Sequence, residues 1–282
     1  MRAALFVLAI TVAWGADTTP LDRANALYLR TDYAGAINLL KQSQQDAKTL
    51  EMLGRAYFMN GEFHRATDVL EKAAGLNPNS STIQMWLGRA YGRRAETAFP
   101  VAALGYASRT RQAFEKAVEL DSTNNEAVND LFEYYTEAPG IVGGGVDKAR
   151  KLLPLIAKND AAEGHFAAAK LAEANKEYHA AETLMKKAMD AAPREVGRIL
   201  DLAKFLARRN RFDESEKYFQ QAQKITPDAP KILYARAEAY VESKRNPEQA
   251  RDLLKKYLAS SLTTDDPPRS EAQKLLKRVE GS

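Results

Sequence analysis

The 282-residue sequence contains no cysteine and only three histidines. Without cysteine the chain forms no disulfide, no thiolate metal site and no cysteine nucleophile. Three histidines spread over the chain leave little room for an imidazole metal site, so we expect no metal and no cofactor. The His-Glu-x-x-His and Gly-x-Ser-x-Gly signatures of zinc proteases and serine hydrolases are also missing from the sequence. Together these absences predict a protein that is not an enzyme and has no catalytic residues.

The sequence also lacks a strong imbalance of charge. Lys and Arg number 41 and Asp and Glu 37, a net charge of +4. Proteins that bind nucleic acid usually concentrate basic charge on one face, so we expect no nucleic-acid partner. With 45% hydrophobic residues, 15 Gly and 11 Pro, the composition is that of a chain that folds around a core.

One apolar run stands at the start of the chain. Arg2 is followed by the uncharged stretch Ala3–Trp14, and small residues precede Ala16. This layout is typical of a secretory signal peptide over residues 1–15. The run is too short to span a bilayer of about 30 Å as a helix. We therefore expect a periplasmic or secreted protein without a transmembrane segment in the mature chain; the alternative is a short apolar helix docked on the fold.

The remainder of the sequence repeats itself. Leu53-Gly54 and Tyr57 recur 34 residues later as Leu87-Gly88 and Tyr91. Related residues recur at the same internal spacing in two further stretches, Ala168–Pro193 and Leu202–Pro227. Each copy has two blocks of apolar residues at helical period, separated by a short polar turn, and most copies close on a Pro that ends a helix. The pattern predicts tandem helix–turn–helix units.

These residues resemble the tetratricopeptide repeat, a 34-residue helix–turn–helix unit. The resemblance implies an all-α, right-handed α-solenoid in which small residues sit where two helices cross. About seven units are expected, at residues 17–46, 47–80, 81–124, 125–161, 162–195, 196–229 and 230–260. A linker and a C-terminal solvating helix follow over residues 261–282, with Asp266-Pro267 as the predicted helix start.

Two units depart from the 34-residue frame. In the third, Pro100 should end the first helix, and residues 101–120 can form one long helix whose first turns project beyond their neighbours. In the fourth, the Gly-rich loop 139–145 separates the helices; we interpret it as a shaped turn with positive φ rather than a phosphate loop. These features together resemble a group of uncharacterised exported bacterial tetratricopeptide proteins. The sequence leaves open whether the long helix or the loop is functional.

By analogy with the family, the first helices line a concave groove that binds a partner. The residues expected to face it alternate cations or amides with aromatic rings, and they are Asn25, Tyr28, Arg55, Phe58, Arg89, Arg93, Phe166, Lys170, Lys204 and Tyr234. Arg grips carboxylates through paired hydrogen bonds, so we expect an unknown protein or peptide partner of acidic character. The alternative for these charges is a solvated wall of ion pairs.

The sequence thus predicts a non-catalytic protein–protein interaction scaffold of the bacterial cell envelope. It binds a peptide or protein segment along a concave groove. The alternative is a binding module for a cell-wall polymer such as peptidoglycan or polysaccharide. The identity of the partner, the biological process and the oligomeric state are not encoded in any motif that we find.

Overall fold

The computed structural model describes residues 19–227 and 229–281. These residues form fifteen α-helices and one 3-10 turn, and no β-strand occurs among them. The predicted all-α class is confirmed. The expected signal peptide, residues 1–15, lies outside the described residues.

Fourteen of the helices form seven consecutive antiparallel pairs. They are α1 (Pro20–Leu29) with α2 (Tyr33–Lys41), α3 (Ala47–Met59) with α4 (Phe63–Leu76), α5 (Ser81–Thr97) with α6 (Pro100–Leu120), α7 (Asn125–Glu137) with α8 (Val146–Asn159), α9 (Ala161–Ala174) with α10 (Tyr178–Ala191), α11 (Val196–Arg208) with α12 (Phe212–Ile225), and α13 (Pro230–Glu242) with α14 (Pro247–Ala259). A fifteenth helix, α15 (Arg269–Glu280), ends the array.

The turn inside each regular pair has one recurring backbone geometry. A residue in the left-handed region follows the first helix, with φ between 53° and 81° at Thr31, Gly61, Lys176, Asn210 and Lys244. The next N–H then donates to a carbonyl five residues back, as in Glu62 N to Tyr57 O at 2.9 Å. This is the Schellman arrangement, which satisfies the last carbonyls of a helix and reverses the chain. The polar turns of the sequence are therefore helix-ending devices.

Small residues let the two helices of a pair approach closely. Gly54 of α3 faces the Leu70 side chain of α4, and Gly88 of α5 faces the Phe114 ring of α6. A Cβ atom at Gly88 would lie 2.5 Å from that ring. Ala66 and Ala73 of α4 are fully buried at the same interface. The repeated Leu-Gly and Ala positions are thus packing positions, as the resemblance implied.

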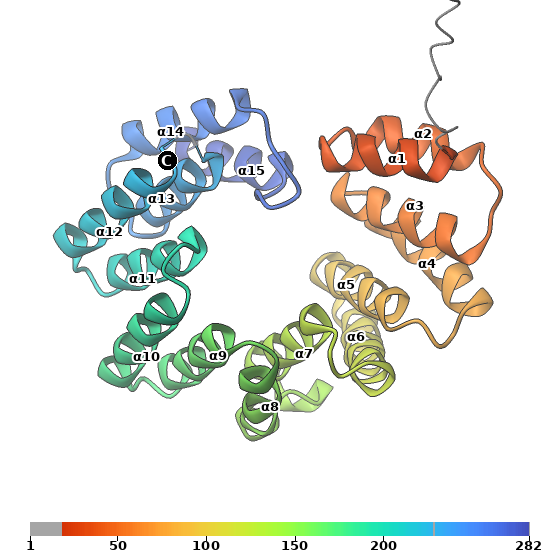
Figure 1. Cartoon of the computed structure of the whole chain (residues 1–282), viewed down its shortest axis with the longest axis horizontal. Coiled ribbons are helices and arrows are strands. Elements are labelled where there is room, and N and C mark those ends of the chain that lie inside the picture. The colour runs from red at the N-terminus through yellow and green to blue at the C-terminus, as the bar shows by residue number, and fades with distance from the viewer. Residues whose placement is uncertain (1–18, 228, 282) are drawn as a thin grey trace, which may run out of the picture.

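Stacked side by side, the pairs form a curved array. The first helices α1, α3, α5, α7, α9, α11 and α13 lie on the inside of the curve, and the second helices lie outside (Figure 1). The predicted α-solenoid is confirmed. Its curvature brings the C-terminal end back towards the N-terminal half. An ion pair between Arg93 of α5 and Glu271 of α15, at 3.1 Å, shows this proximity. Residues 262–273 also share a cleft of about 240 Å³ with Tyr33 and Met59.

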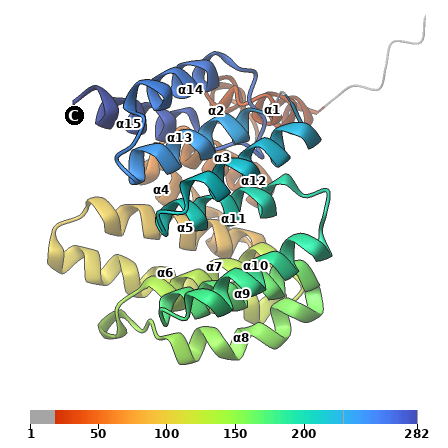
Figure 2. The same cartoon turned by 90° about the vertical axis from the view of Figure 1, so that its left-hand side faces the viewer.

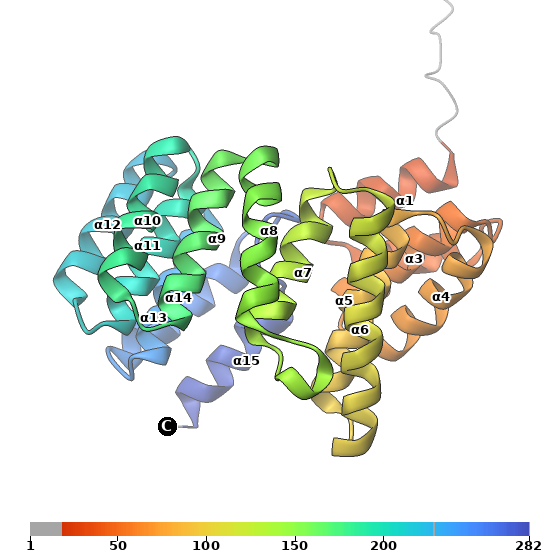
Figure 3. The same cartoon turned by 90° about the horizontal axis from the view of Figure 1, so that it is seen from below.

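The third and fourth pairs carry the two irregular features. Pro100 begins α6, which runs for 21 residues, so that the α5–α6 hairpin projects beyond the neighbouring turns (Figures 2 and 3). Between α7 and α8 the chain makes the 3-10 turn η1 (Gly140–Val142). Gly143 and Gly145 follow it with φ of 91° and 154°. Both the long helix and the positive-φ turn agree with the sequence-based predictions.

Helix α15 covers the open end of the array. Its buried residues Ala272, Leu275 and Val279 pack with Leu254 and Tyr257 of α14 in one apolar cluster. The predicted helix start at Asp266-Pro267 is wrong, because α15 begins at Arg269. The Asp266 carboxylate instead accepts hydrogen bonds from the backbone N–H and the hydroxyl of Thr263, at 2.9 and 3.1 Å. It stabilises a turn before the helix.

Candidate functional site

The inner face of the N-terminal repeats is a stack of aromatic rings and guanidinium groups. The Arg55 guanidinium lies 5.2 Å from the centre of the Tyr28 ring and 5.3 Å from the Trp86 ring. Arg89 lies on Trp86 as well, at 4.6 Å. Phe58 packs edge-on against Trp86 at 5.4 Å. This stack joins α1, α3 and α5 and uses Trp86, which the sequence analysis did not single out.

The cations of the inner face are held by carboxylates of a neighbouring first helix. Arg89 donates to both oxygens of Asp130 on α7, at 2.6 and 3.2 Å, and also pairs with Glu126 at 3.0 Å. Lys204 of α11 pairs with Glu238 of α13 at 3.4 Å. Paired guanidinium and carboxylate groups of this kind fix neighbouring helices in register.

The same arrangement continues in the C-terminal repeats. Arg198 of α11 pairs with Glu163 of α9 and lies 4.8 Å from the Phe166 ring. Arg208 pairs with Glu173 at 3.0 Å. Of the predicted groove cations, Arg55, Arg89, Arg93 and Lys204 make ion pairs within the molecule.

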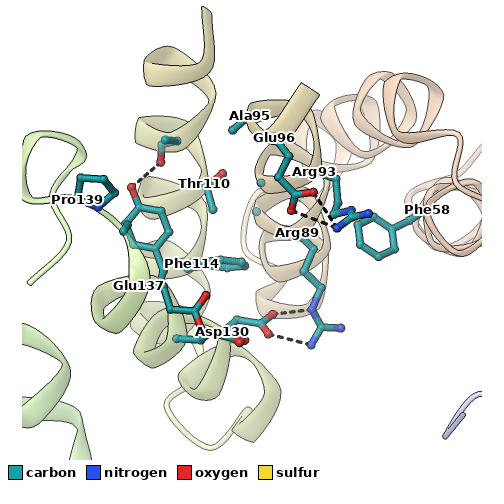
Figure 4. Close-up of a pocket in the computed structure, with 16 residues that line it drawn as sticks. Phe58, Arg89, Arg93, Ala95, Glu96, Thr110, Phe114, Asp130, Glu137 and Pro139 are labelled. Atoms are coloured by element: carbon teal, nitrogen blue, oxygen red, sulfur yellow. Dashed lines mark hydrogen bonds and ion pairs between the residues drawn. The ribbon is translucent and has the colours of Figure 1, made fainter. Parts of the chain in front are cut away.

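A cavity of about 480 Å³ interrupts this wall between α5, α6 and α7. Phe58, Arg89 and Arg93, three of the predicted groove residues, line it (Figure 4). The remaining lining is Gly88, Gly92, Ala95, Glu96, Ala107, Thr110, Phe114, Asp130, Glu133, Tyr134, Glu137, Ala138 and Pro139. Apolar atoms and short side chains dominate this list, and a volume of this size accommodates a large side chain of a partner.

The cavity exists because the third and fourth units are irregular. The extended end of α5 supplies Gly92 and Ala95, whose small side chains leave space. On the opposite wall the Tyr134 hydroxyl lies 2.9 Å from the carbonyl of Ala107 on α6 and 2.8 Å from that of Val142 in η1. These contacts fix the loop and hold Pro139 at the rim (Figure 4).

Carboxylates outnumber cations around the cavity. Arg93 is engaged by Glu96 at 2.8 Å and by Glu271, and Arg89 is held as described above. By contrast, no described residue holds Glu133 or Glu137 in an ion pair. Partial desolvation beside the cavity and the charge of Glu137 raise the pKa of Glu133, and the charge of Lys170 opposes this shift. The cavity thus offers an apolar interior beside negative charge that has no ion-pair partner among the described residues.

Comparison with known proteins identifies the repeats. Residues 51–125 and 172–232 each match a tetratricopeptide repeat family model. The chain is a tetratricopeptide repeat protein. A thermophilic tetratricopeptide repeat protein from Thermus thermophilus is 21% identical, with a TM-score of 0.57 over 68% of this chain and 99% of its own.

A tetratricopeptide repeat protein from Parabacteroides merdae is 13% identical, with a TM-score of 0.60 over 93% of this chain and 97% of its own. At these identities the likeness shows the fold. No curated protein matches the sequence.

The other predicted groove residues of this tetratricopeptide repeat protein are spread along the curve. Asn25 is exposed on α1, whereas Tyr28 is buried beneath Arg55. Phe166 and Lys170 lie on α9, and Tyr234 of α13 packs on Tyr257 at 5.4 Å. Of the predicted groove residues, the cavity gathers only Phe58, Arg89 and Arg93, so the groove as a whole stays a prediction.

Sequence reasoning missed Asp130, Glu163 and Glu173, three carboxylates that hold cations of the inner face. One signal was present, because several pairs lie about one repeat apart. Glu163 and Arg198 are 35 residues apart, as are Glu173 and Arg208. Opposite charges at this spacing on first helices predict contacts between neighbouring repeats.

Among the described residues, no group of three or more His, Cys, Asp or Glu is placed to hold a metal ion. No helix within the described ranges combines the length and the apolar character needed to cross a bilayer.

Proposed function

We propose that the protein is a non-catalytic interaction scaffold that binds a protein segment along its inner face, with one side chain of the segment seated in the cavity between α5, α6 and α7. Tetratricopeptide repeats are protein–protein interaction scaffolds in general. The observation that carries the proposal is the 480 Å³ cavity, which lies on the inner face and is lined mostly by apolar and small residues. Anchoring of a bulky side chain in such a pocket is how interfaces gain most of their affinity.

The charges near the cavity favour a particular neighbour for that anchor. Glu133 and Glu137 are not engaged in ion pairs within the described structure, whereas Arg89 and Arg93 are. A basic residue of the partner next to its apolar anchor therefore gains an ion pair without breaking one. An acidic segment, as expected from the sequence, has to displace carboxylates such as Asp130. The acidic partner stays a prediction. Binding measurements with acidic and with basic peptides decide whether the bound segment is acidic or basic.

We place the site of action in the bacterial cell envelope. The support is the charged start and apolar run of residues 2–14, which have the layout of an export signal. Fractionation of cells that produce the full chain, followed by mass determination of the product, tests both export and cleavage ahead of Ala16.

The binding site is tested by filling the cavity. A Cβ atom at Gly92 meets only Thr110, at 3.7 Å, so Gly92→Leu extends a side chain into the cavity without a clash at its base. The matched control is Gly75→Leu on the outer helix α4, where a Cβ atom meets nothing within 4 Å. We expect crosslinking in intact cells to capture the partner with wild type and with Gly75→Leu. Capture should fall about tenfold or more with Gly92→Leu, the loss typical of blocking a central anchor.

Equal capture by Gly92→Leu and wild type would remove the cavity from the binding site. Co-sedimentation of the purified protein with peptidoglycan, unaffected by Gly92→Leu and without a captured protein, would instead favour the cell-wall polymer as ligand. Peptides that differ only in an Asp or a Lys beside a Leu anchor then report the preferred charge.

A further inference from the structure

Exposed apolar side chains concentrate at the tip formed by the α5–α6 hairpin and the adjacent α7–α8 loop. Of the eight large apolar residues that are exposed in the described structure, four lie here: Phe99 at 88%, Val101 at 87%, Leu104 at 47% and Ile141 at 82%. The hairpin and the loop lie side by side at the same edge of the array (Figure 3). A patch of this kind on a soluble fold marks an interaction surface.

The tip carries no charge of its own. Residues 97–108 contain no Asp, Glu, Lys or Arg, and neither do residues 138–146. The hairpin is nevertheless rigid at its base, because the Arg94 guanidinium lies 4.3 Å from the Tyr106 ring and Tyr106 stacks on Tyr91. It is therefore a stiff, uncharged projection of the fold.

Cations stand directly behind the apolar residues. A cleft of about 330 Å³ between the hairpin and the loop is lined by Leu104 and Ile141 at the tip and by Arg111 and Lys148 further in. No carboxylate is among its lining residues, but Arg111 already makes an ion pair with Glu115 at 3.0 Å, so Lys148 is the cation that remains. The Lys148 ammonium donates only to the Gly143 carbonyl, at 2.9 Å, and lies 5.4 Å from the Tyr135 ring. Its positive charge is thus open to an anionic ligand.

We propose that the tip docks on an anionic lipid bilayer, with Phe99, Val101, Leu104 and Ile141 inserted into the interface. Apolar side chains that enter the acyl region, with cations at the level of the lipid phosphates, are the two requirements of a membrane-surface anchor. The Lys148 ammonium lines the cleft behind Ile141 and makes no ion pair among the described residues, so it is the cation for a lipid phosphate.

The test is co-sedimentation of the full chain with vesicles of phosphatidylcholine, with or without phosphatidylglycerol. We expect wild type to bind the anionic vesicles, less so as salt is raised. The triple variant Phe99→Ser, Val101→Ser, Ile141→Ser should bind about tenfold more weakly or worse. Lys148→Gln should lose about fivefold on anionic vesicles, with no change on pure phosphatidylcholine.

The control for apolar exposure is Leu76→Ser with Ile225→Ser. Both side chains are exposed, at 60% and 40%, and both end second helices at the opposite edge. This double variant should bind as wild type does. Every variant is compared with the same N-terminus, so differences in binding between variants report the tip.

A second measurement does not depend on the triple variant. Because the chain has no cysteine, Ala102→Cys can be labelled uniquely with a polarity-sensitive fluorophore. We expect a blue shift on anionic vesicles at Ala102→Cys and none at Gly75→Cys. The proposal is overturned if wild type ignores anionic vesicles, or if the triple variant binds them equally well. A dimer seen by light scattering, lost in the triple variant and unaffected by vesicles, would assign the tip to a second copy instead.

Discussion

At the scale of single residues, glycine sets the distance between paired helices. Gly88 faces the Phe114 ring, whereas Gly75 faces open space. Gly88→Ala should lower the free energy of unfolding by about 1 kcal/mol or more, because overpacking outweighs the helix propensity gained. Gly75→Ala should raise it by about 0.5 kcal/mol. Urea denaturation followed by circular dichroism measures both, and shifts of the same sign would contradict this role of Gly88.

A second residue-scale prediction concerns pH. Partial desolvation and the charge of Glu137 raise the pKa of Glu133 in the folded state. A raised carboxyl pKa means that the folded state disfavours the charge, so stability is lost as pH rises from the unfolded value through the folded one. Glu133→Gln should therefore stabilise the protein at pH 7, by about 0.5 kcal/mol or less after solvent screening. The gain should vanish below the ordinary pKa of glutamate. A gain that persists at low pH would exclude ionisation as its cause.

The residues of the inner face also show what the sequence could and could not predict. Repeat-register positions such as Gly54 and Ala66 were placed correctly, because each depends only on the neighbouring helix of the same unit. The partner of Arg89 was not, since Asp130 lies 41 residues away in a unit lengthened by the extra turns of α5 and α6. The cavity depends on the same irregularity, and no local pattern encodes its volume.

At the scale of elements, α15 seals the array. In stacked repeats each unit is stabilised by its neighbours, so a weakened end opens first. Leu275→Ala, which removes a buried contact to α14, should cost about 2–3 kcal/mol. Hydrogen exchange should accelerate in α13–α15 and remain unchanged in α1–α4. Uniform acceleration along the chain would mean that the array unfolds as one unit.

Element boundaries were predictable where a single residue type decides them. Pro100 fixes the start of α6 because it fits the first turn of a helix and ends the preceding one. The helix start predicted at Asp266-Pro267 was wrong, because Asp266 accepts hydrogen bonds from Thr263 in a turn that precedes the helix. The same Asp-Pro pair suits both roles, and only the tertiary position of α15 on α14 selects between them.

At the scale of the whole molecule, the array curves until its ends meet. The Arg93–Glu271 pair joins residues 178 positions apart, and it contributes about 0–1 kcal/mol as a partly exposed ion pair. Curvature therefore comes from the packing of successive pairs, and the ion pair only marks where the turn closes. The sequence did not predict this closure, because it results from small rotations between successive pairs that add up over the seven pairs. It makes the inner face, with its cavity, a surface that a bound segment would share with α15.

The most direct test of binding on the inner face is site-specific photocrosslinking in living cells. A photoreactive amino acid replaces Ala95, which lines the cavity, or Gly75, which lies on the outer helix α4. We predict a crosslinked protein partner from position 95 and none from position 75. Adducts from position 75 alone, or in equal yield from both, would contradict the account.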